Sequence, residues 1–301
     1  ELYRGLAASG IRHITPRHEQ GAGFMADGYA RACGKPGVAF VITGPGLTNT
    51  LTPMAQARAD SVPMLVVTGV NPTATLGRGL GCLHELPDQI GLSKTVSITA
   101  QTILNADDLL PAIDSAFEQM NTQRGGPHHI EIPLDVAVVD HEMPTKKITL
   151  GAPKAPDADK LDQAIDMLTK AKRPVVLVGG GAKRADAAIG ALAEKIDAAV
   201  ILTVNARGVM HRHPLCIPAS ASLTAVRDEI EAADCVLALG TEFGPTDYDM
   251  MAGLGLPEMQ QLIRVDVSSE QLERHPADLK IEADAKLVAE ALAQQLPNLP
   301  I

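Results

Sequence analysis

An acidic side chain stands where a polar turn runs into a helix in the segment ITPRHEQGAGFMADGYARACG, residues 14–34. This residue is Glu19. The small residues Gly21, Gly23 and Ala26 leave one face of the helix without bulky side chains. Such a surface lets a second backbone, a cofactor or a partner subunit approach closely. The same position also suits an acidic residue that only stabilises a helix N-terminus. Both a functional and a structural interpretation of Glu19 therefore stay open.

A buried strand runs directly into two glycines around a proline in the segment VAFVITGPGLTN, residues 38–49. Open α/β sheets bind ligands at strand ends of this kind. Gly44 and Gly46 would let a ligand reach main-chain groups, and Pro45 makes the turn rigid. An ordinary tight turn would explain the same three residues equally well.

A glycine triplet, 179–181, lies between a strand and a helix in the segment VVLVGGGAKRAD. It resembles a dinucleotide-binding fingerprint, but Arg184 stands where the third glycine of that fingerprint should fall. Asp266, at the end of a later strand, could accept a hydrogen bond from a ribose hydroxyl or could cap a helix. The phosphate-binding lysine loop is absent from the sequence.

Metal and hydrolase chemistry have little support in the sequence. No histidine pair has the HExxH spacing of a zinc protease, no GxSxG motif occurs, and the four cysteines form no CxxC pair. The histidines considered as ligands are His18, His84, His128, His129, His211 and His213. Surface or turn positions explain these side chains better than a metal site does.

Short β-rich runs alternate with alanine-rich helical stretches along almost the whole chain, which predicts an α/β fold with two doubly wound parallel-sheet domains. Strands are predicted at residues 11–15, 38–43, 64–68, 129–132, 175–178, 199–204, 235–239 and 262–267. Helices are predicted at residues 1–10, 19–33, 48–60, 107–123, 160–171, 185–196, 221–232 and 285–295. The proline-rich residues 141–156 are predicted to link domains at 1–140 and 157–301.

The charge balance excludes several classes of partner. Lys and Arg number 26 and Asp and Glu number 36, so the formal net charge is −10. This charge disfavours binding to nucleic acid or to an anionic membrane surface. No run reaches the ~18 apolar residues of a membrane span, and no signal segment opens the chain. The four cysteines are not spaced like a disulfide framework, which fits a reducing cytoplasm.

Five segments, in this order, resemble thiamine-diphosphate-dependent enzymes of the acetolactate-synthase-like family: RHEQGAGFMADGYAR, TGPGLTNTLTPMAQARADSVPMLVVTG, GPHHIEIPLDV, RPVVLVGGGA and LIRVDVSSEQ. The resemblance implies a pyrimidine-binding domain at 1–140 and a Rossmann-like central domain at 157–301. The family's C-terminal domain binds the cofactor diphosphate and Mg²⁺ through a GDG and a later Asn, and no segment here matches it. We therefore expect a truncated piece, or a separate third domain, and weak binding of thiamine diphosphate by this chain alone.

By the same resemblance, Glu19 is the glutamate that hydrogen-bonds the pyrimidine ring nitrogen. It favours the imino tautomer, whose exocyclic nitrogen then deprotonates the thiazolium carbon. This role requires a raised pKa of Glu19, which burial would supply against the opposing helix N-terminus. His18, beside it, could relay protons near neutral pH. The family's cofactor-approaching loop corresponds to Gly44, Pro45, Gly46 and Asn49.

Two departures from the family concern the substrate. Leu83-His84-Glu85 stands where acetolactate synthases usually read Phe-Gln-Glu, and Ala100 stands where they read Lys, which counts against acetolactate synthase itself. His84 could still contact the reaction intermediate. Glu85 and Asp88 either favour a cationic 2-oxo acid, as in a decarboxylase of a guanidino-2-oxo acid from arginine breakdown, or are solvated loop charges.

The resemblance thus implies an enzyme that decarboxylates a 2-oxo acid and either releases an aldehyde or passes the carbanion to an acceptor. Its cofactor would lie between two subunits, so a homodimer or homotetramer is expected. FAD is not expected, because residues 217–232 look short for a flavin clamp. The alternative from another class is a non-catalytic nucleotide-binding or regulatory module that uses the triplet 179–181.

Overall fold

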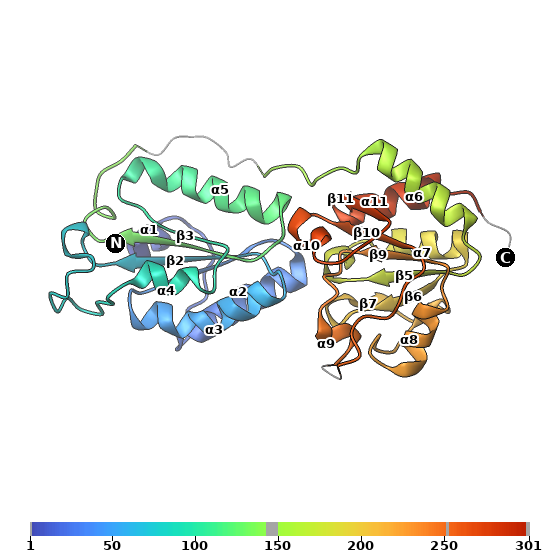
Figure 1. Ribbon diagram of the computed structural model, residues 1–301. Coiled ribbons are helices and arrows are strands. Elements are labelled where there is room, and N and C mark those ends of the chain that lie inside the picture. Colours follow the sequence, from blue (N-terminus) through green and yellow to red (C-terminus); the bar gives the residue numbers. More distant parts are fainter. Residues whose placement is uncertain (1, 143–149, 251–252, 299–301) are drawn as a thin grey trace. The chain divides into compact units, whose positions relative to one another are not determined.

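The computed structural model describes residues 2–142, 150–250 and 253–298 and divides the chain into two compact units (Figure 1). The first unit comprises Glu1–Ala152 and the second Pro153–Ile301. The division falls inside the predicted linker 141–156, of which residues 143–149 lie outside the described residues. Within the described ranges, no helix has the length and apolar character needed to cross a membrane.

The first unit is built on a four-stranded parallel sheet in the order β1-β2-β4-β3. The central strands are buried along nearly their whole length, which suits the apolar sequence of β2, whereas β4 buries His128, His129 and Glu131 among its apolar residues. The strands are β1 (Gly37–Val41), β2 (Met64–Val70), β3 (Thr99–Thr102) and β4 (Pro127–Pro133). The helices are α1 (Leu2–Ala8), α2 (Glu19–Cys33), α3 (Pro45–Ala59), α4 (Gln89–Lys94) and α5 (Leu109–Thr122), with short 3₁₀ turns η1 (Thr73–Thr75) and η2 (Ala106–Asp108).

Two apolar layers cover opposite faces of this sheet (Figure 1). Helices α2 and α3 form one layer, in which Leu47 and Met54 pack against Val66 of β2. Helix α5 forms the other layer, in which Ala116 packs against the face of the sheet that includes Ile130. Coverage on both faces is what a doubly wound parallel sheet requires.

The two helices of the first layer lie very close together. A Cβ atom at Gly23 would lie 2.3 Å from Cγ of Pro53, so only glycine fits at this crossing. At the far end of the pair, Arg31 forms ion pairs with Asp27 and Asp60, each at 2.7 Å. Part of the small-residue surface of α2 therefore serves its packing on α3, and this packing fixes the starts of both helices.

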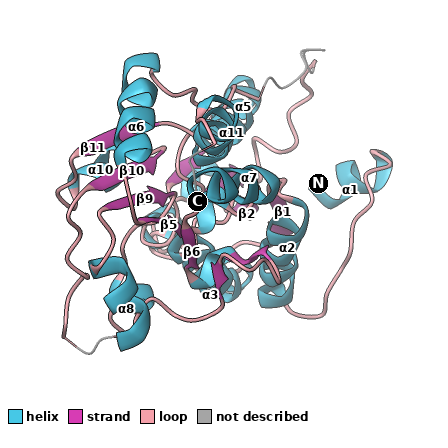
Figure 2. Ribbon diagram, turned by 90° about the vertical axis from the view of Figure 1, so that its right-hand side faces the viewer, coloured by secondary structure: helices cyan, strands magenta, loops and turns pink. Residues whose placement is uncertain are grey.

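The second unit is a six-stranded parallel sheet in the order β11-β10-β9-β5-β6-β8, and Figure 2 shows β11, β10, β9, β5 and β6 following one another across it. Helices α6, α7 and α11 cover one face, and α8 covers the other. The strands are β5 (Pro174–Val178), β6 (Ala199–Leu202), β7 (Arg207–Met210), β8 (Cys216–Ile217), β9 (Cys235–Leu239), β10 (Leu262–Asp266) and β11 (Leu279–Glu282). The helices are α6 (Ala158–Lys170), α7 (Asp186–Ile196), α8 (Thr224–Glu231), α9 (Pro245–Tyr248), α10 (Ser269–Glu273) and α11 (Ala285–Gln295), with 3₁₀ turns η3 (Gly180–Ala182) and η4 (Val204–Ala206).

The predicted fold class, two parallel-sheet α/β domains, is confirmed, and several predicted elements are wrong. The strand predicted at 11–15 does not form, and Ile11 and Ile14 are 62% and 67% exposed. Helix α3 begins at Pro45, three residues before its predicted start, because proline suits the first turn of a helix. The short elements α4, β3 and β11 were not predicted, since few residues carry too little periodicity to reveal them.

Candidate active site

The predicted site residues of the first unit gather around the starts of α2 and α3 and the carboxyl ends of the strands. His18 caps α2, and its Nδ1 accepts the N–H of Gln20 at 3.1 Å. Glu19 is the first residue of α2, and Asn49 lies in the second turn of α3. These two side chains meet, since Asn49 Nδ2 donates to Glu19 Oε2 at 3.0 Å.

Glu19 is half-buried as a residue, but its carboxyl group is little desolvated, and the pKa of this group lies below its ordinary value. The main cause is the hydrogen bond from Asn49, followed by a backbone N–H at the helix start; the small desolvation of this carboxylate opposes them. The expected rise of the Glu19 pKa is therefore wrong for this chain by itself. Burial within the described residues is too slight to overcome two hydrogen bonds to the anion.

The glycines after β1 are required by packing. Gly44 has φ 62°, a left-handed conformation, and a Cβ atom there would lie 2.2 Å from the carbonyl oxygen of His84. At Gly46, a Cβ atom would lie 2.7 Å from Cγ2 of Ile42. Pro45 is exposed and begins α3. This segment is thus no ordinary tight turn, because its backbone is pressed against the loop that carries His84.

Residues 76–88, between η1 and α4, form the loop that carries His84, here called the His84 loop. A hydrogen bond from the end of β2 holds this loop in place. Asn71, directly after β2, donates from Nδ2 to the carbonyl oxygen of Leu83 at 3.0 Å. His84 has φ 58°, and its Nδ1 is buried with no hydrogen-bond partner in the described part of the chain. A buried imidazole nitrogen without a partner is costly, which marks it as a group that a ligand could satisfy.

Glu85 and Asp88, the two acidic residues considered for a cationic substrate, instead accept hydrogen bonds from nearby backbone N–H groups. The carboxylate of Glu85 accepts the N–H of Leu80 at 3.2 Å and of Cys82 at 2.9 Å, and these backbone hydrogen bonds lower the pKa of Glu85. Asp88 caps α4, and its Oδ1 accepts the N–H of Gly91 at 2.7 Å. Both charges are thus held by backbone N–H groups, and the loop shape depends on them.

Gln89 and Glu131 are buried polar residues near this site that the sequence analysis missed. Gln89 Oε1 accepts the N–H of Gly44 at 2.7 Å, and Gln89 Nε2 donates to Glu131 Oε2 at 2.9 Å. Burial raises the pKa of Glu131. The one available signal was a carboxylate between two isoleucines in the predicted strand segment PHHIEIP. Gln89 gave no signal, because a glutamine at a helix start is ordinary.

The two histidines of β4 are structural. His128 and His129 are buried, and desolvation lowers the pKa of each to about 4, so both are neutral near pH 7. Their partners are hydroxyl groups, Thr99 for His128 at 2.7 Å and Thr68 for His129 at 2.9 Å. Among the described residues, no group of three or more His, Cys, Asp or Glu side chains could hold a metal ion.

The glycine triplet of the second unit is also explained by packing. A Cβ atom at Gly179 would lie 2.1 Å from the carbonyl oxygen of Gly240, and one at Gly181 would lie 3.0 Å from its Cα. The triplet leads into the 3₁₀ turn η3, and α7 begins only at Asp186, so no long helix starts at these glycines. Asp266 accepts the N–H of Ser268 at 3.0 Å through Oδ1. Neither feature therefore requires a nucleotide.

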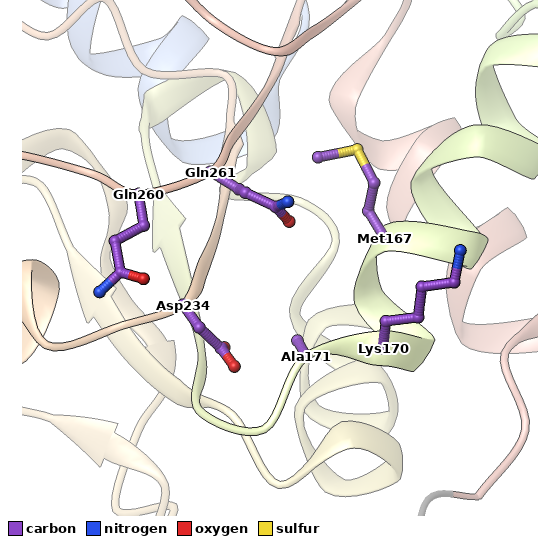
Figure 3. A pocket seen from close by; sticks show the side chains of 6 residues that line it. All are labelled: Met167, Lys170, Ala171, Asp234, Gln260 and Gln261. Atoms are coloured by element: carbon purple, nitrogen blue, oxygen red, sulfur yellow. The ribbon is translucent and has the colours of Figure 1, made fainter.

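A hollow of about 390 Å³ in the second unit lies at the amino ends of β5, β9 and β10 (Figure 3). Parallel sheets bind ligands at the opposite, carboxyl edge. The lining residue Asp234 also accepts the N–H groups of Lys172 and Arg173, at 2.7 and 2.9 Å, so its carboxylate closes a turn. This hollow is therefore not a candidate site.

Comparisons with known proteins identify families for both units. Residues 1–92 match the family described as thiamine pyrophosphate enzyme, N-terminal TPP binding domain, and residues 161–292 match thiamine pyrophosphate enzyme, central domain. A solved structure of a thiamine diphosphate-dependent 4-hydroxybenzoylformate decarboxylase from Rhodococcus jostii RHA1 superposes with a TM-score of 0.81 and 22% identity, over 97% of this chain and 56% of that one. This likeness supports the fold.

Two curated relatives are similar over nearly the whole chain. The chain is 42% identical over 302 residues to "Probable 2-ketoarginine decarboxylase AruI" of Pseudomonas aeruginosa, across 99% of this chain and 54% of the relative. It is 33% identical over 308 residues to the acetolactate synthase isozyme 1 large subunit of Escherichia coli, across 98% of this chain and 52% of the relative. The chain thus spans about half the length of these relatives.

Proposed function

The chain belongs to the thiamine pyrophosphate enzymes, of which it carries the N-terminal and central domains, and we propose that it serves the thiamine-diphosphate-dependent decarboxylation of a 2-oxo acid. The observation that carries this proposal is the pair formed by Glu19 and Asn49 at the adjoining starts of α2 and α3. It presents a carboxylate with one oxygen fixed by a neutral amide.

The side chains of the first unit fit the aminopyrimidine of thiamine diphosphate. When bound, this cofactor would supply a carbon nucleophile for the 2-oxo carbon and a cationic ring that accepts the electron pair left behind when CO₂ departs. Asn49 holds Oε2 of Glu19, and the carboxyl group of Glu19 would exchange a proton with the pyrimidine ring nitrogen. That exchange needs a neutral fraction of Glu19, and exclusion of water by the cofactor and a second subunit would raise its pKa.

His84 is proposed to act on the substrate side of this site. Its loop packs against Gly44, and the buried Nδ1 without a partner could accept or donate one hydrogen bond to a ligand, according to its tautomer. His18 is a weaker candidate for proton relay, because its Nδ1 already accepts from the helix start. Gly44, Pro45 and Gly46 then serve by placing α3 and the His84 loop beside each other.

A homodimer or homotetramer is part of the proposal. Helix α2, next to Glu19, exposes the large side chains Phe24, Met25 and Tyr29, at 43%, 41% and 53%. Side chains of this kind are typical of surfaces that a second subunit covers.

Mg²⁺ and the diphosphate of the cofactor would be bound by the family's third domain. The four cysteines form no disulfide in the described part of the chain, which suits a cytoplasmic location. No flavin is proposed, and flavin absorbance in the purified protein would contradict this.

For the substrate, we propose a 2-oxo acid with a guanidino group, in line with the 42% identical relative whose name includes 2-ketoarginine decarboxylase. Glu85 and Asp88 are held by backbone N–H groups, so other residues must recognise the guanidinium. Acetolactate formation is the second candidate, because a 33% identical relative is an acetolactate synthase subunit.

The complete protein, with thiamine diphosphate and Mg²⁺, should be assayed for CO₂ release from 5-guanidino-2-oxopentanoate, pyruvate and 2-oxoisovalerate. We expect a kcat/KM at least about 10-fold higher for the guanidino acid than for pyruvate. Acetolactate formed from pyruvate as the main product would instead favour the carboligase. Absence of turnover with all three acids, together with absence of thiamine diphosphate binding, would contradict the proposed function.

A further inference from the structure

A series of buried polar side chains connects the Gly44 loop to the middle of the sheet in the first unit. Gln89, 5% exposed, forms the central link. Its Oε1 accepts two hydrogen bonds, from Gly44 N at 2.7 Å and from Thr43 Oγ1 at 2.8 Å. Both donors belong to the segment between β1 and α3.

The other end of the Gln89 amide faces the central strands. Its Nε2 donates to Glu131 Oε2 at 2.9 Å and to the carbonyl oxygen of Gly69 at 3.1 Å, with a longer contact of 3.3 Å to Thr68 Oγ1. Glu131 is 3% exposed, and its Oε1 accepts from Thr102 Oγ1 at 2.6 Å. Thr68 and Thr102 are the strand neighbours of Glu131, so this polar layer crosses three strands at one level.

The primary amide of Gln89 satisfies both ends of this link. The Gly44 N–H can only donate, and a carboxylate such as Glu131 accepts, so the residue between them must accept at one end and donate at the other. An apolar side chain of the same size would leave the Gly44 N–H, the Thr43 hydroxyl and Glu131 without this partner in a buried layer. Each unsatisfied buried group is costly, so the loop would be expected to move.

Gly44 directly precedes α3, and α3 carries the residue that orients Glu19. The carbonyl oxygen of Gly44 accepts the N–H of Thr48, and Asn49 follows at once with its hydrogen bond to Glu19. We propose that Gln89 is a positioning residue: anchored on Glu131, it sets the place of Gly44 and thereby the contact of Asn49 with the carboxylate of Glu19. The inference rests on the proposed function for its meaning in catalysis, although its geometry does not depend on the reaction.

Two variants of α4 separate this role from general support of the helix. Gln89→Met keeps the volume and removes both the acceptor and the donor. Ser93→Ala removes a hydroxyl from a fully buried residue of the same helix, and the Oγ of Ser93 has no hydrogen-bond partner among the described residues. In the complete protein without cofactor, amide hydrogen exchange at Gly44 should speed up by about 10- to 100-fold in Gln89→Met. Ser93→Ala should change this rate by less than about 3-fold, because the Ser93 hydroxyl forms no hydrogen bond to Gly44 or Gln89 in the described part of the chain.

Binding of thiamine diphosphate provides the second measurement. The Kd for thiamine diphosphate, measured with Mg²⁺ by calorimetry, should rise by about 10-fold or more in Gln89→Met and stay within about 2-fold in Ser93→Ala. Gln89→Glu places a second carboxyl group beside Glu131, so the pair keeps a proton more readily than either group alone. This variant should resemble Gln89→Met only at a pH high enough to ionise both groups, because the ionised side chain cannot donate to Glu131.

A rescue experiment keeps the inference testable if Gln89→Met folds poorly. In the double variant Gln89→Glu with Glu131→Gln, the carboxylate at position 89 accepts from Gly44 and Thr43, and the amide at position 131 donates to it. The Gly69 carbonyl oxygen still loses its donor in this double variant, so recovery should be partial. The amide exchange rate of Gly44 and the Kd for thiamine diphosphate should improve by about 3-fold or more over Gln89→Glu alone. A general loss of packing would not be repaired by exchanging the two side chains.

Unchanged Gly44 exchange in Gln89→Met, or a double variant no better than Gln89→Glu alone, would overturn the inference. If the wild-type protein binds no thiamine diphosphate, the proposed function fails, and exchange at Gly44 alone then decides the role of Gln89. If the wild-type protein binds the cofactor and the Gly44 exchange rate does not respond to Gln89→Met, only the role of Gln89 fails.

Discussion

Asn49 donates a 3.0 Å hydrogen bond to Glu19 and thereby joins the beginnings of α2 and α3, although the two residues are 30 positions apart in the sequence. The close packing of Gly23 on Pro53 brings these helices together. Both the amide and the helix start stabilise the anion of Glu19, so its pKa in the chain alone lies below the ordinary value. Proton exchange with a cofactor then requires that binding exclude water and raise this pKa.

Glu19→Gln should abolish most turnover in the complete, cofactor-loaded protein. The amide is close in shape to the acid and can still hydrogen-bond, but it cannot exchange a proton, so kcat should fall by about 100- to 10,000-fold. Steady-state rates of CO₂ release from the preferred 2-oxo acid test this. A kcat within a few-fold of wild type would remove Glu19 from the mechanism, and unchanged thermal unfolding would serve as the control for folding.

Asn49→Leu should raise the pKa of Glu19. It removes the hydrogen bond that contributes most to the depressed value, while the helix start still favours the anion. Titration of the Glu19 carboxyl carbon by NMR in the apoprotein measures the shift. Thr52→Ala, an exposed position on the same helix, is the matched control and should leave the titration unchanged. A Glu19 pKa that stays in place in Asn49→Leu would contradict the assignment of its cause.

Gly44→Ala should lower the free energy of unfolding far more than Gly79→Ala does. Both glycines have left-handed backbones, with φ 62° and 63°, but only at Gly44 would the new Cβ meet another atom, the His84 carbonyl oxygen at 2.2 Å. The backbone penalty alone is about 1–2 kcal/mol. Unfolding by urea should show about that loss for Gly79→Ala and a clearly larger one for Gly44→Ala. Equal losses would mean that the His84 loop yields easily.

Glu85→Gln should not change selectivity for a guanidino acid. The Glu85 carboxylate is engaged by the N–H groups of Leu80 and Cys82, so its charge is directed at the loop. We expect kcat/KM to fall by a similar factor for the guanidino acid and for 2-oxoisovalerate, because the His84 loop loosens. A loss of about 10-fold or more confined to the guanidino acid would show that Glu85 binds the substrate cation.

The protein should lose stability in acid because of His128 and His129. Their pKa values of about 4 in the folded state lie below the ordinary 6.5, so the unfolded chain binds protons first as the pH falls. The stability they contribute is present above pH 6.5 and is lost as the pH falls towards 4, on the order of 3 kcal/mol for each.

Urea unfolding of His129→Gln at pH 7 and pH 4.5 measures this difference. The variant should lose less stability between the two pH values than wild type does, whereas His211→Asn, at an exposed position, should behave as wild type does. An identical pH dependence in His129→Gln and wild type would rule out this histidine as a source of the acid sensitivity.

The sequence predicted helix α2 with its correct bounds, because both ends carry strong local signals. His18 caps the start, and Gly34 adopts the left-handed conformation that ends the helix. β9 and α11 were also predicted with their correct bounds. In contrast, the segment 11–15 had the composition of a strand, but it pairs with no other strand in the described residues, and pairing depends on tertiary structure.

The sequence by itself determined the alternation of strands and helices, the class of fold and the segments that resemble the family, because apolar periodicity and glycine positions are local properties. Only the tertiary structure decided what Glu19, Glu85 and Gln89 contact. Asn49 and the backbone N–H groups of Leu80 and Cys82 reach their partners through chain turns that no periodicity encodes. The Gly44 N–H meets Gln89 45 residues further along the chain, because α4 begins beside the carboxyl ends of β1 and β2, where Gln89 also contacts Gly69.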